Sequence, residues 1–392
     1  MKPWIVAIWL GFLAGAITSV VLVVMGQFED LIWAGDRTWL RIFLTVMAGA
    51  VLIALLRPHA PDASVETEIE DETADVARQS LRAAGYFTVL GVVSVAFGAA
   101  LGPEGGILAL IGQLSAYIAR RIGKTAAEER LIRQMGTAGA LGGLYHSPPG
   151  GASYTDSRPD APWPLLLIAG LSGFAGLMLT SALLPKGHGL RIPLPASQAA
   201  VDAQSLTLLL LAAVFGAALG LVFLGSRSVA TRALAWLSGD VRVQVLAGSL
   251  VFAILAAIWP ILLFNGQEAL SEVVTGALVA GPGLLVAIAL LKAIAAALCL
   301  AAGWLGGPVM PIAFVGATGG LALAQLVPGL DPGLAAAAGV GAAETVALRR
   351  PLVALLVVVF TATTAAPIAV LIGVAVGWAV SARLPAAAPA HH

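Results

Sequence analysis

The chain has 392 residues, of which 59% are hydrophobic and only 11% are charged, and its formal net charge at pH 7 is zero. A soluble domain carries about 25% charged residues, so this composition is typical of a protein embedded in lipid. The balanced charge provides no basic surface for nucleic acid. The one cysteine, Cys299, lies in an apolar run, which excludes a disulfide framework and favours a small buried side chain over a redox or metal role.

Apolar runs take up most of the sequence, beginning near the N-terminus. The run at residues 3–25 is too long for the apolar region of a signal peptide and lacks a clear cleavage site, so we expect a retained first span. The spans predicted in chain order are residues 4–25, 40–56, 83–101, 165–184, 206–224, 243–264, 284–302 and 351–380. Shorter apolar runs lie at residues 107–118, 135–144, 311–326 and 334–348. A straight span needs about 20 residues, so the shorter runs are expected to be half-helices or re-entrant segments.

One loop carries a cluster of basic residues between two of the shorter runs. By the positive-inside rule this loop is expected to be cytoplasmic, in a multi-pass protein of a bacterial-type inner membrane. The basic residues are Arg120, Arg121, Lys124, Arg130 and Arg133.

Two glycine-rich loops occupy matching positions in the two halves of the chain. Gly102-Pro-Glu-Gly-Gly and Gly306-Gly-Pro-Val-Met-Pro are each followed by another glycine ten positions on, and each leads to a proline junction, at Pro148 and Pro351. Duplicated halves with broken helices are the signature of secondary transporters and related pores.

We therefore expect an all-α polytopic membrane protein with two related halves, residues 1–190 and 206–392, joined by a linker at residues 191–205. Broken and re-entrant helices would meet at a central site. The spacing does not distinguish parallel from inverted repeats; we expect inverted ones, and no cytoplasmic regulatory domain.

Glu104 is a lone carboxylate among glycines between two apolar stretches. An ionisable residue within a membrane is costly and marks a functional site by default. The glycines leave bare N–H groups at the start of the next helix, which favour anions. A tethered carboxylate can compete with a free anion there, and protonation would release it. The alternative is a helix-start carboxylate satisfied by its own backbone.

These loops resemble those of the CLC family of chloride channels and proton/chloride antiporters. Gly102-Pro-Glu-Gly-Gly is similar to the family's Gly-Arg-Glu-Gly-Pro loop. The segment from Lys292 to Pro311 resembles its lysine-led helix and Gly-Gly-x-Phe-x-Pro loop. His146-Ser-Pro-Pro-Gly-Gly resembles the Asn-Ala-Pro-x-Ala-Gly junction, and residues 63–68 resemble the Gly-Ser-Gly-Ile-Pro-Glu loop.

The resemblance implies an anion pore gated by Glu104, chloride as the transported ion, and a homodimer with one pore in each subunit. It requires no cofactor or metal. The anion-binding residues that it implies are Ser64, Gly105, Gly106, Gly307, Val309 and Met310.

The chain departs from the family pattern at several positions. Pro103 replaces an arginine, Gly106 a proline, and Val309 a phenylalanine whose backbone amide helps to hold the anion. The family's anion-coordinating tyrosine belongs to its last helix, whereas the tyrosines here, Tyr86, Tyr117, Tyr145 and Tyr154, all lie in the first half.

The position of the antiporters' inner proton-transfer glutamate falls at or beside Arg158, with Asp156 the nearest acid. Asp156 and His146 are therefore candidates for a proton path. The competing interpretations are a solvated loop or local ion pair for Asp156 and Arg158, and a packing or capping role for His146. Lys292 is expected to pair or snorkel rather than to bind substrate. Glu344 receives no role.

Three functions follow from these patterns. The first is anion transport through a CLC-like pore, as a channel or a loosely coupled anion/proton exchanger. The second is a broken-helix transporter for another ion or small solute, which predicts more paired intramembrane acids than this sequence has. The third is an intramembrane enzyme, which is disfavoured because no His-Glu-x-x-His motif, aspartate pair or Gly-x-Ser-x-Gly elbow occurs.

Overall fold

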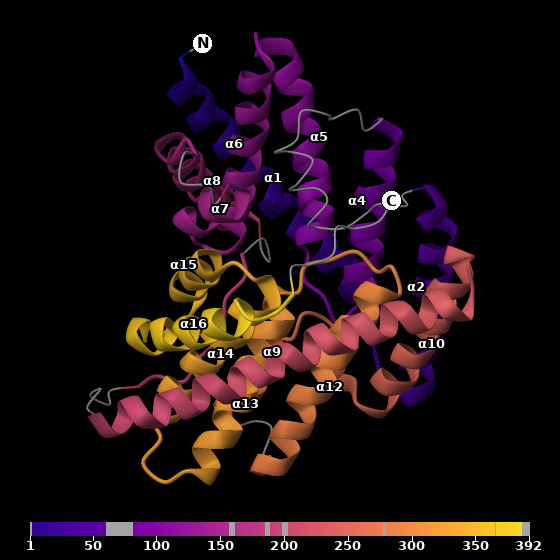
Figure 1. Cartoon of the computed structure of the whole chain (residues 1–392). Helices are drawn as coiled ribbons and strands as arrows, with labels where there is room; N and C mark the ends of the chain where they lie inside the picture. The colour runs from indigo at the N-terminus through magenta and orange to yellow at the C-terminus, as the bar shows by residue number, and fades with distance from the viewer. Residues whose placement is uncertain are drawn as a thin grey trace.

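The computed structural model describes residues 2–59, 81–156, 161–184, 189–197, 203–276, 280–364 and 366–385. Within these residues the chain is helical and forms no sheet (Figure 1). The helices of the first half are α1 (Pro3–Ile32), α2 (Trp39–Leu56), η1 (Arg57–His59), α4 (Leu81–Ala96), α5 (Glu104–Ile122), α6 (Ala126–Leu144), α7 (Pro148–Thr155) and α8 (Trp163–Leu183). Those of the second half are α9 (Ala203–Leu237), α10 (Val241–Ile258), η2 (Pro260–Leu262), α11 (Gln267–Thr275), α12 (Pro282–Ala301), α13 (Val309–Leu326), α14 (Pro332–Leu348), α15 (Pro351–Thr361) and α16 (Pro367–Ser381).

The helix contacts repeat from one half to the other. In the first half α6 packs on α1, α5, α7 and α8, and in the second half α14 packs on α9, α13, α15 and α16. Likewise α4 packs on α5 as α12 packs on α13. The halves meet where α2 lies beside α10 and where α7 lies beside α15, as Figure 1 shows for the first pair. The chain therefore consists of two related halves.

Proline and short polar side chains set many of the helix starts. Proline suits the first turn of a helix because its missing N–H has no intrahelical acceptor there. It stands in the first two positions of α1, α7, α8, α12, α14, α15 and α16. Side-chain oxygens of Thr38, Thr125, Ser147, Asp240 and Asp331 accept a first-turn amide of α2, α6, α7, α10 and α14.

Among the described residues, seven helices are long and apolar enough to cross a membrane, and the chain is a multi-pass membrane protein. The prediction of one span at residues 351–380 was wrong: α15 ends at Thr361 and α16 begins at Pro367. The run at 311–326 was predicted to be a half-helix, but α13 begins at Val309 and has 18 residues. Predicted spans 83–101 and 243–264 end early, at Ala96 and Ile258, because the chain then turns.

Helices of each half approach closely at glycines. A Cβ on Gly139 of α6 would lie 2.6 Å from the Gly11 Cα of α1, and a Cβ on Gly316 of α13 would lie 2.7 Å from the Val340 Cα of α14. Such small residues let backbones pack in the absence of a hydrophobic driving force. The largest buried cluster mixes side chains from both halves, such as Leu108 and Phe314, so the halves share one interior.

Candidate functional site

The two glycine-rich loops of the sequence pair with each other in the middle of the molecule. Gly102 and Gly307 form an isolated antiparallel bridge. The Gly102 N–H donates to the Gly307 carbonyl at 2.8 Å, and the Gly307 N–H lies 3.3 Å from the Gly102 carbonyl. The bridge places the N-terminus of α5 next to the N-terminus of α13. Two positive helix ends therefore converge on one point.

The carboxylate of Glu104 occupies that point. Glu104 is the first residue of α5 and is only 1% exposed. Its Oε2 accepts a hydrogen bond from the Gly307 N–H at 3.1 Å, and its Oε1 accepts one from the Tyr145 hydroxyl at 3.0 Å. A negatively charged group is thus held by a backbone amide of the opposite half and by a phenol.

Glycine at positions 102 and 307 leaves room for this carboxylate. A Cβ on Gly307 would lie 2.5 Å from the Glu104 Cδ, and a Cβ on Gly102 would overlap the Glu104 carboxylate oxygens. No real side chain tolerates such distances, so either substitution would displace the carboxylate. Gly102 was not among the predicted site residues, because a glycine that makes room looks the same in sequence as one that only turns the chain.

Gly105 and Gly106 lie in the first turn of α5, ahead of the first intrahelical bond, which the Ile107 N–H donates to Pro103 at 3.4 Å. Their N–H groups are among those at the start of a helix that have no carbonyl acceptor within the helix. The same glycines also permit close packing. A Cβ on Gly105 would lie 2.7 Å from the Leu305 Cγ, and one on Gly106 would lie 2.9 Å from the Met25 Cε.

Val309 and Met310 begin α13 and are fully buried. The first intrahelical bond of α13 comes from the Ile312 N–H to the Pro308 carbonyl, at 2.9 Å. Because Pro308 and Pro311 have no N–H, the first turn of α13 presents the amides of Val309 and Met310 alone. These positions fit the predicted anion-binding role, which stays a prediction.

Tyr145 is the site residue that the sequence analysis missed. It follows α6 directly, and the Thr361 hydroxyl of α15 donates to its backbone carbonyl at 2.7 Å. His146 then takes a positive φ of 52°, which turns the chain into α7. The Tyr145 ring stacks on the Tyr154 ring with centroids 6.3 Å apart. A tyrosine of the first half thus reaches the carboxylate, although the family's tyrosine was expected from the last helix.

The two candidates for a proton path lie at opposite ends of α7. His146 is buried with its ring edge-to-face on Phe174, at 5.7 Å between centroids. Asp156 accepts a hydrogen bond from the Gln134 amide of α6 at 3.1 Å and is 4% exposed. The interpretation of Asp156 as part of a solvated loop was therefore wrong. Ser64 and Arg158 lie outside the described residues.

Lys292 binds the protein itself, as the sequence analysis favoured. Its buried ammonium group donates to the carbonyls of Leu262, Leu263 and Phe264 at 3.0, 2.9 and 2.8 Å, and lies 3.4 Å from that of Ile261. It also lies 5.5 Å from the centroid of the Phe314 ring. Lys292 therefore fixes the loop that follows η2.

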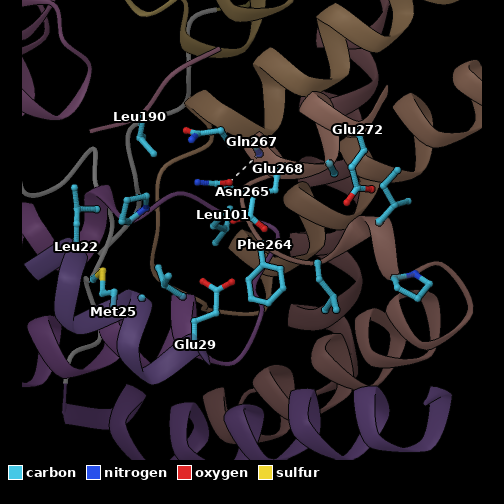
Figure 2. A pocket seen from close by; sticks show the side chains of 18 of the residues that line it. Leu22, Met25, Glu29, Leu101, Leu190, Phe264, Asn265, Gln267, Glu268 and Glu272 are labelled. Atoms are coloured by element: carbon cyan, nitrogen blue, oxygen red, sulfur yellow. Dashed lines mark hydrogen bonds between the residues drawn. The ribbon is translucent and has the colours of Figure 1, made fainter. Parts of the chain in front are cut away.

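That loop forms part of the wall of a cavity of about 380 Å³, which Leu101 and Pro103 border from the side of α5. Figure 2 shows Glu268 and Glu272 of α11 on one side of this cavity and Leu22, Met25 and Glu29 of α1 on the other. The cavity therefore borders the loop that leads to Glu104.

Comparison with known proteins places the chain in a family. The family model described as voltage gated chloride channel matches residues 46–382. No curated protein matches the sequence.

Solved structures match the fold at low sequence identity. A CLC-type fluoride/proton antiporter matches with a TM-score of 0.79 and 20% identity, over 97% of this chain and 95% of the other. A slow cyanobacterial Cl⁻/H⁺ antiporter matches with a TM-score of 0.79 and 18% identity, over 97% and 94%. A eukaryotic CLC transporter matches with a TM-score of 0.70 and 17% identity, over 96% and 72%. With its paired helix N-termini, its buried glutamate between them and this match over most of its length, the chain belongs to the voltage gated chloride channel family.

Proposed function

We propose that this protein carries an inorganic anion across the membrane, with chloride as the first candidate, and that Glu104 is its gate. The observation that carries the proposal is the pair of hydrogen bonds to the Glu104 carboxylate from Gly307 and Tyr145. A carboxylate in this position occupies a site that would otherwise suit a free anion.

The donors at this site suit passage as well as binding. An anion that leaves water needs N–H and O–H groups in place of its hydration shell, held weakly enough to release it. The N-termini of α5 and α13 provide amides and partial positive charge without a full cation. Gly105, Gly106, Val309 and Met310 are the first-turn residues whose amides we assign to the anion.

Protons enter through the same carboxylate. In its ionised form Glu104 blocks the site, and in its protonated form it no longer competes with the anion and leaves. We favour a loosely coupled anion/proton exchanger over a channel, because Tyr145 supplies the hydroxyl that the missing last-helix tyrosine would have supplied. The structural relatives described as fluoride/proton and Cl⁻/H⁺ antiporters support this choice. We further propose a homodimer in a bacterial inner membrane, without enzymatic activity.

The test is ion flux from liposomes that contain the purified protein. Vesicles loaded with chloride, fluoride or nitrate are diluted into medium of low anion content, and external anion and pH are recorded together. We expect wild type to release chloride and take up protons in return, and Glu104→Gln to release chloride without proton movement. Release of chloride without proton movement by wild type would establish a channel. Failure of every anion to move would refute the proposed function.

A further inference from the structure

Glu344 is another carboxyl buried within the molecule. It lies on α14, four residues before the end of that helix, and is 0% exposed. Neither of its oxygens has a hydrogen-bond partner among the described residues. The backbone of Ala313 on α13 faces it without meeting hydrogen-bond geometry.

The helices around Glu344 offer it no counter-charge. Helices α13, α15 and α16, which pack on α14, contain no ionisable side chain in their sequences. The fourth neighbour, α9, approaches at Gly220, where a Cβ would lie 2.9 Å from the Ala343 carbonyl oxygen. The arginines of α9, Arg227 and Arg232, lie about 10 and 18 Å farther along the helix at 1.5 Å per residue.

The basic residues that follow α14 are bound elsewhere. Arg349 donates to the Pro385 carbonyl at 2.6 Å, and Arg350 donates to the Tyr154 carbonyl at 2.8 Å. The ionisable groups that act on Glu344 are therefore those of the anion site. Ala313 of α13, whose backbone faces Glu344, lies in the same buried cluster as Tyr145 and Val309, so Glu344 is close enough for charge interaction with Glu104 and Tyr145.

Glu344 and the cavity are linked to Glu104 through different elements. The cavity borders Pro103, on the loop that leads into α5. Glu344 lies six residues before Arg350, which contacts the Tyr154 carbonyl near the end of α7. Tyr154 in turn stacks on Tyr145. Glu344 is thus connected to the Glu104 site through the end of α14 and the two stacked tyrosines.

A buried carboxyl without partners costs stability relative to an apolar residue of similar size. An ionisable residue that is buried in a membrane protein therefore indicates a use in ion or proton movement. We propose that Glu344 is a second proton-binding group of this protein and exchanges a proton with Glu104. This inference rests on the proposed function. In the exchange the Glu344 O–H bond breaks and an O–H bond forms on the Glu104 carboxylate. The Tyr145 hydroxyl, which already donates to Glu104, passes its proton on and receives that of Glu344.

The first test compares Glu344→Gln with wild type in the liposome assay. Glutamine keeps the size of the side chain and cannot carry a proton in this way. We expect proton movement to fall about 100-fold, the scale of one positioned proton-transfer group, while chloride efflux stays within about twofold of wild type, since an uncharged group beyond the gate leaves the anion donors in place. The matched control is Thr345→Val, which removes the neighbouring buried hydroxyl, a group that bonds only to Gly341 of its own helix. In this control, chloride efflux and proton movement should both stay at the wild-type rate.

Proton movement in Glu344→Gln equal to that of wild type would overturn the inference while leaving the proposed function intact. If wild type moves chloride without protons, the inference fails together with the exchanger.

A second readout does not depend on transport. Infrared difference spectra between high and low pH should show the C=O stretch of a protonated carboxyl in wild type, with one component lost in Glu344→Gln and a different one lost in Glu104→Gln. Loss of the component supports proton binding at Glu344 even where the variant or wild type moves no ions. An unchanged spectrum in Glu344→Gln overturns it.

Discussion

Replacing Tyr145 by phenylalanine removes one hydroxyl from the buried carboxylate of Glu104 and leaves the rest of the site in place. The ring still stacks on Tyr154, and the backbone carbonyl still accepts from Thr361. A hydrogen bond to a charged group contributes about 1.5–3 kcal/mol. The equilibrium between the carboxylate in its site and out of it should therefore move by about 10- to 150-fold.

The sign of the change follows from which form of Glu104 the hydroxyl stabilises. Tyr145 donates to the carboxylate, so its loss favours the protonated, released form. Chloride efflux at neutral pH should rise, and the pH of half-maximal efflux should move up by about 1–2 units, since one unit corresponds to about 1.36 kcal/mol.

The assay is chloride efflux from liposomes over a series of pH values. Tyr117→Phe is the matched control, because it removes the same hydroxyl group from a tyrosine of α5 that is 46% exposed. A Tyr145→Phe protein whose efflux depends on pH as wild type does would refute the reasoning. In that case the hydroxyl does not hold the carboxylate in place.

Two further substitutions test the surroundings of the gate. Gly307→Ala places a Cβ 2.5 Å from the Glu104 Cδ and should displace the carboxylate, giving efflux that no longer responds to pH. Gly225→Ala, with nothing within 4 Å of its Cβ, should leave efflux unchanged, and pH-sensitive efflux in Gly307→Ala would contradict the geometry. Lys292→Met should destabilise the fold by about 1–3 kcal/mol for each carbonyl left without a donor, measured by thermal unfolding in detergent. The control is Lys124→Met, at an exposed position, which should change the free energy of unfolding by less than about 0.5 kcal/mol. Equal destabilisation by the two lysine variants would show that the buried contacts of Lys292 contribute little to stability.

The sequence predicted the membrane class, the related halves and the pairing of the two loops at a site, because composition and spacing carry that information. It failed at residues 351–380, where a nearly uniform run of apolar residues hides a break. The break lies between the end of α15 at Thr361 and Pro367, whose ring and missing N–H prevent a helix from continuing through it. That proline was the available signal.

The sequence also failed at residues whose role depends on contacts between distant segments. Tyr145 reaches Glu104 across 41 positions of sequence because the end of α6 returns to the start of α5. Nothing in the residues beside Tyr145 indicates this contact. Glu344 is similar: an acid in an alanine-rich helix usually faces solvent, and only the packing of four helices around α14 shows that it does not.

The distribution of charge around the site explains how an anion could be bound and still leave. The buried cation of α12, Lys292, donates to backbone carbonyls, and Arg350 donates to the Tyr154 carbonyl. What faces the Glu104 carboxylate is instead a phenol and the amides of two helix ends, each end carrying about half a unit charge. The same donors that hold a carboxylate can hold an anion of comparable size, so gate and ion compete on equal terms. We therefore expect efflux to rank anions by how well each fits between the Tyr145 hydroxyl and the Gly307 amide. A fluoride-to-chloride efflux ratio that stays the same when Tyr145 is replaced by phenylalanine would contradict this account.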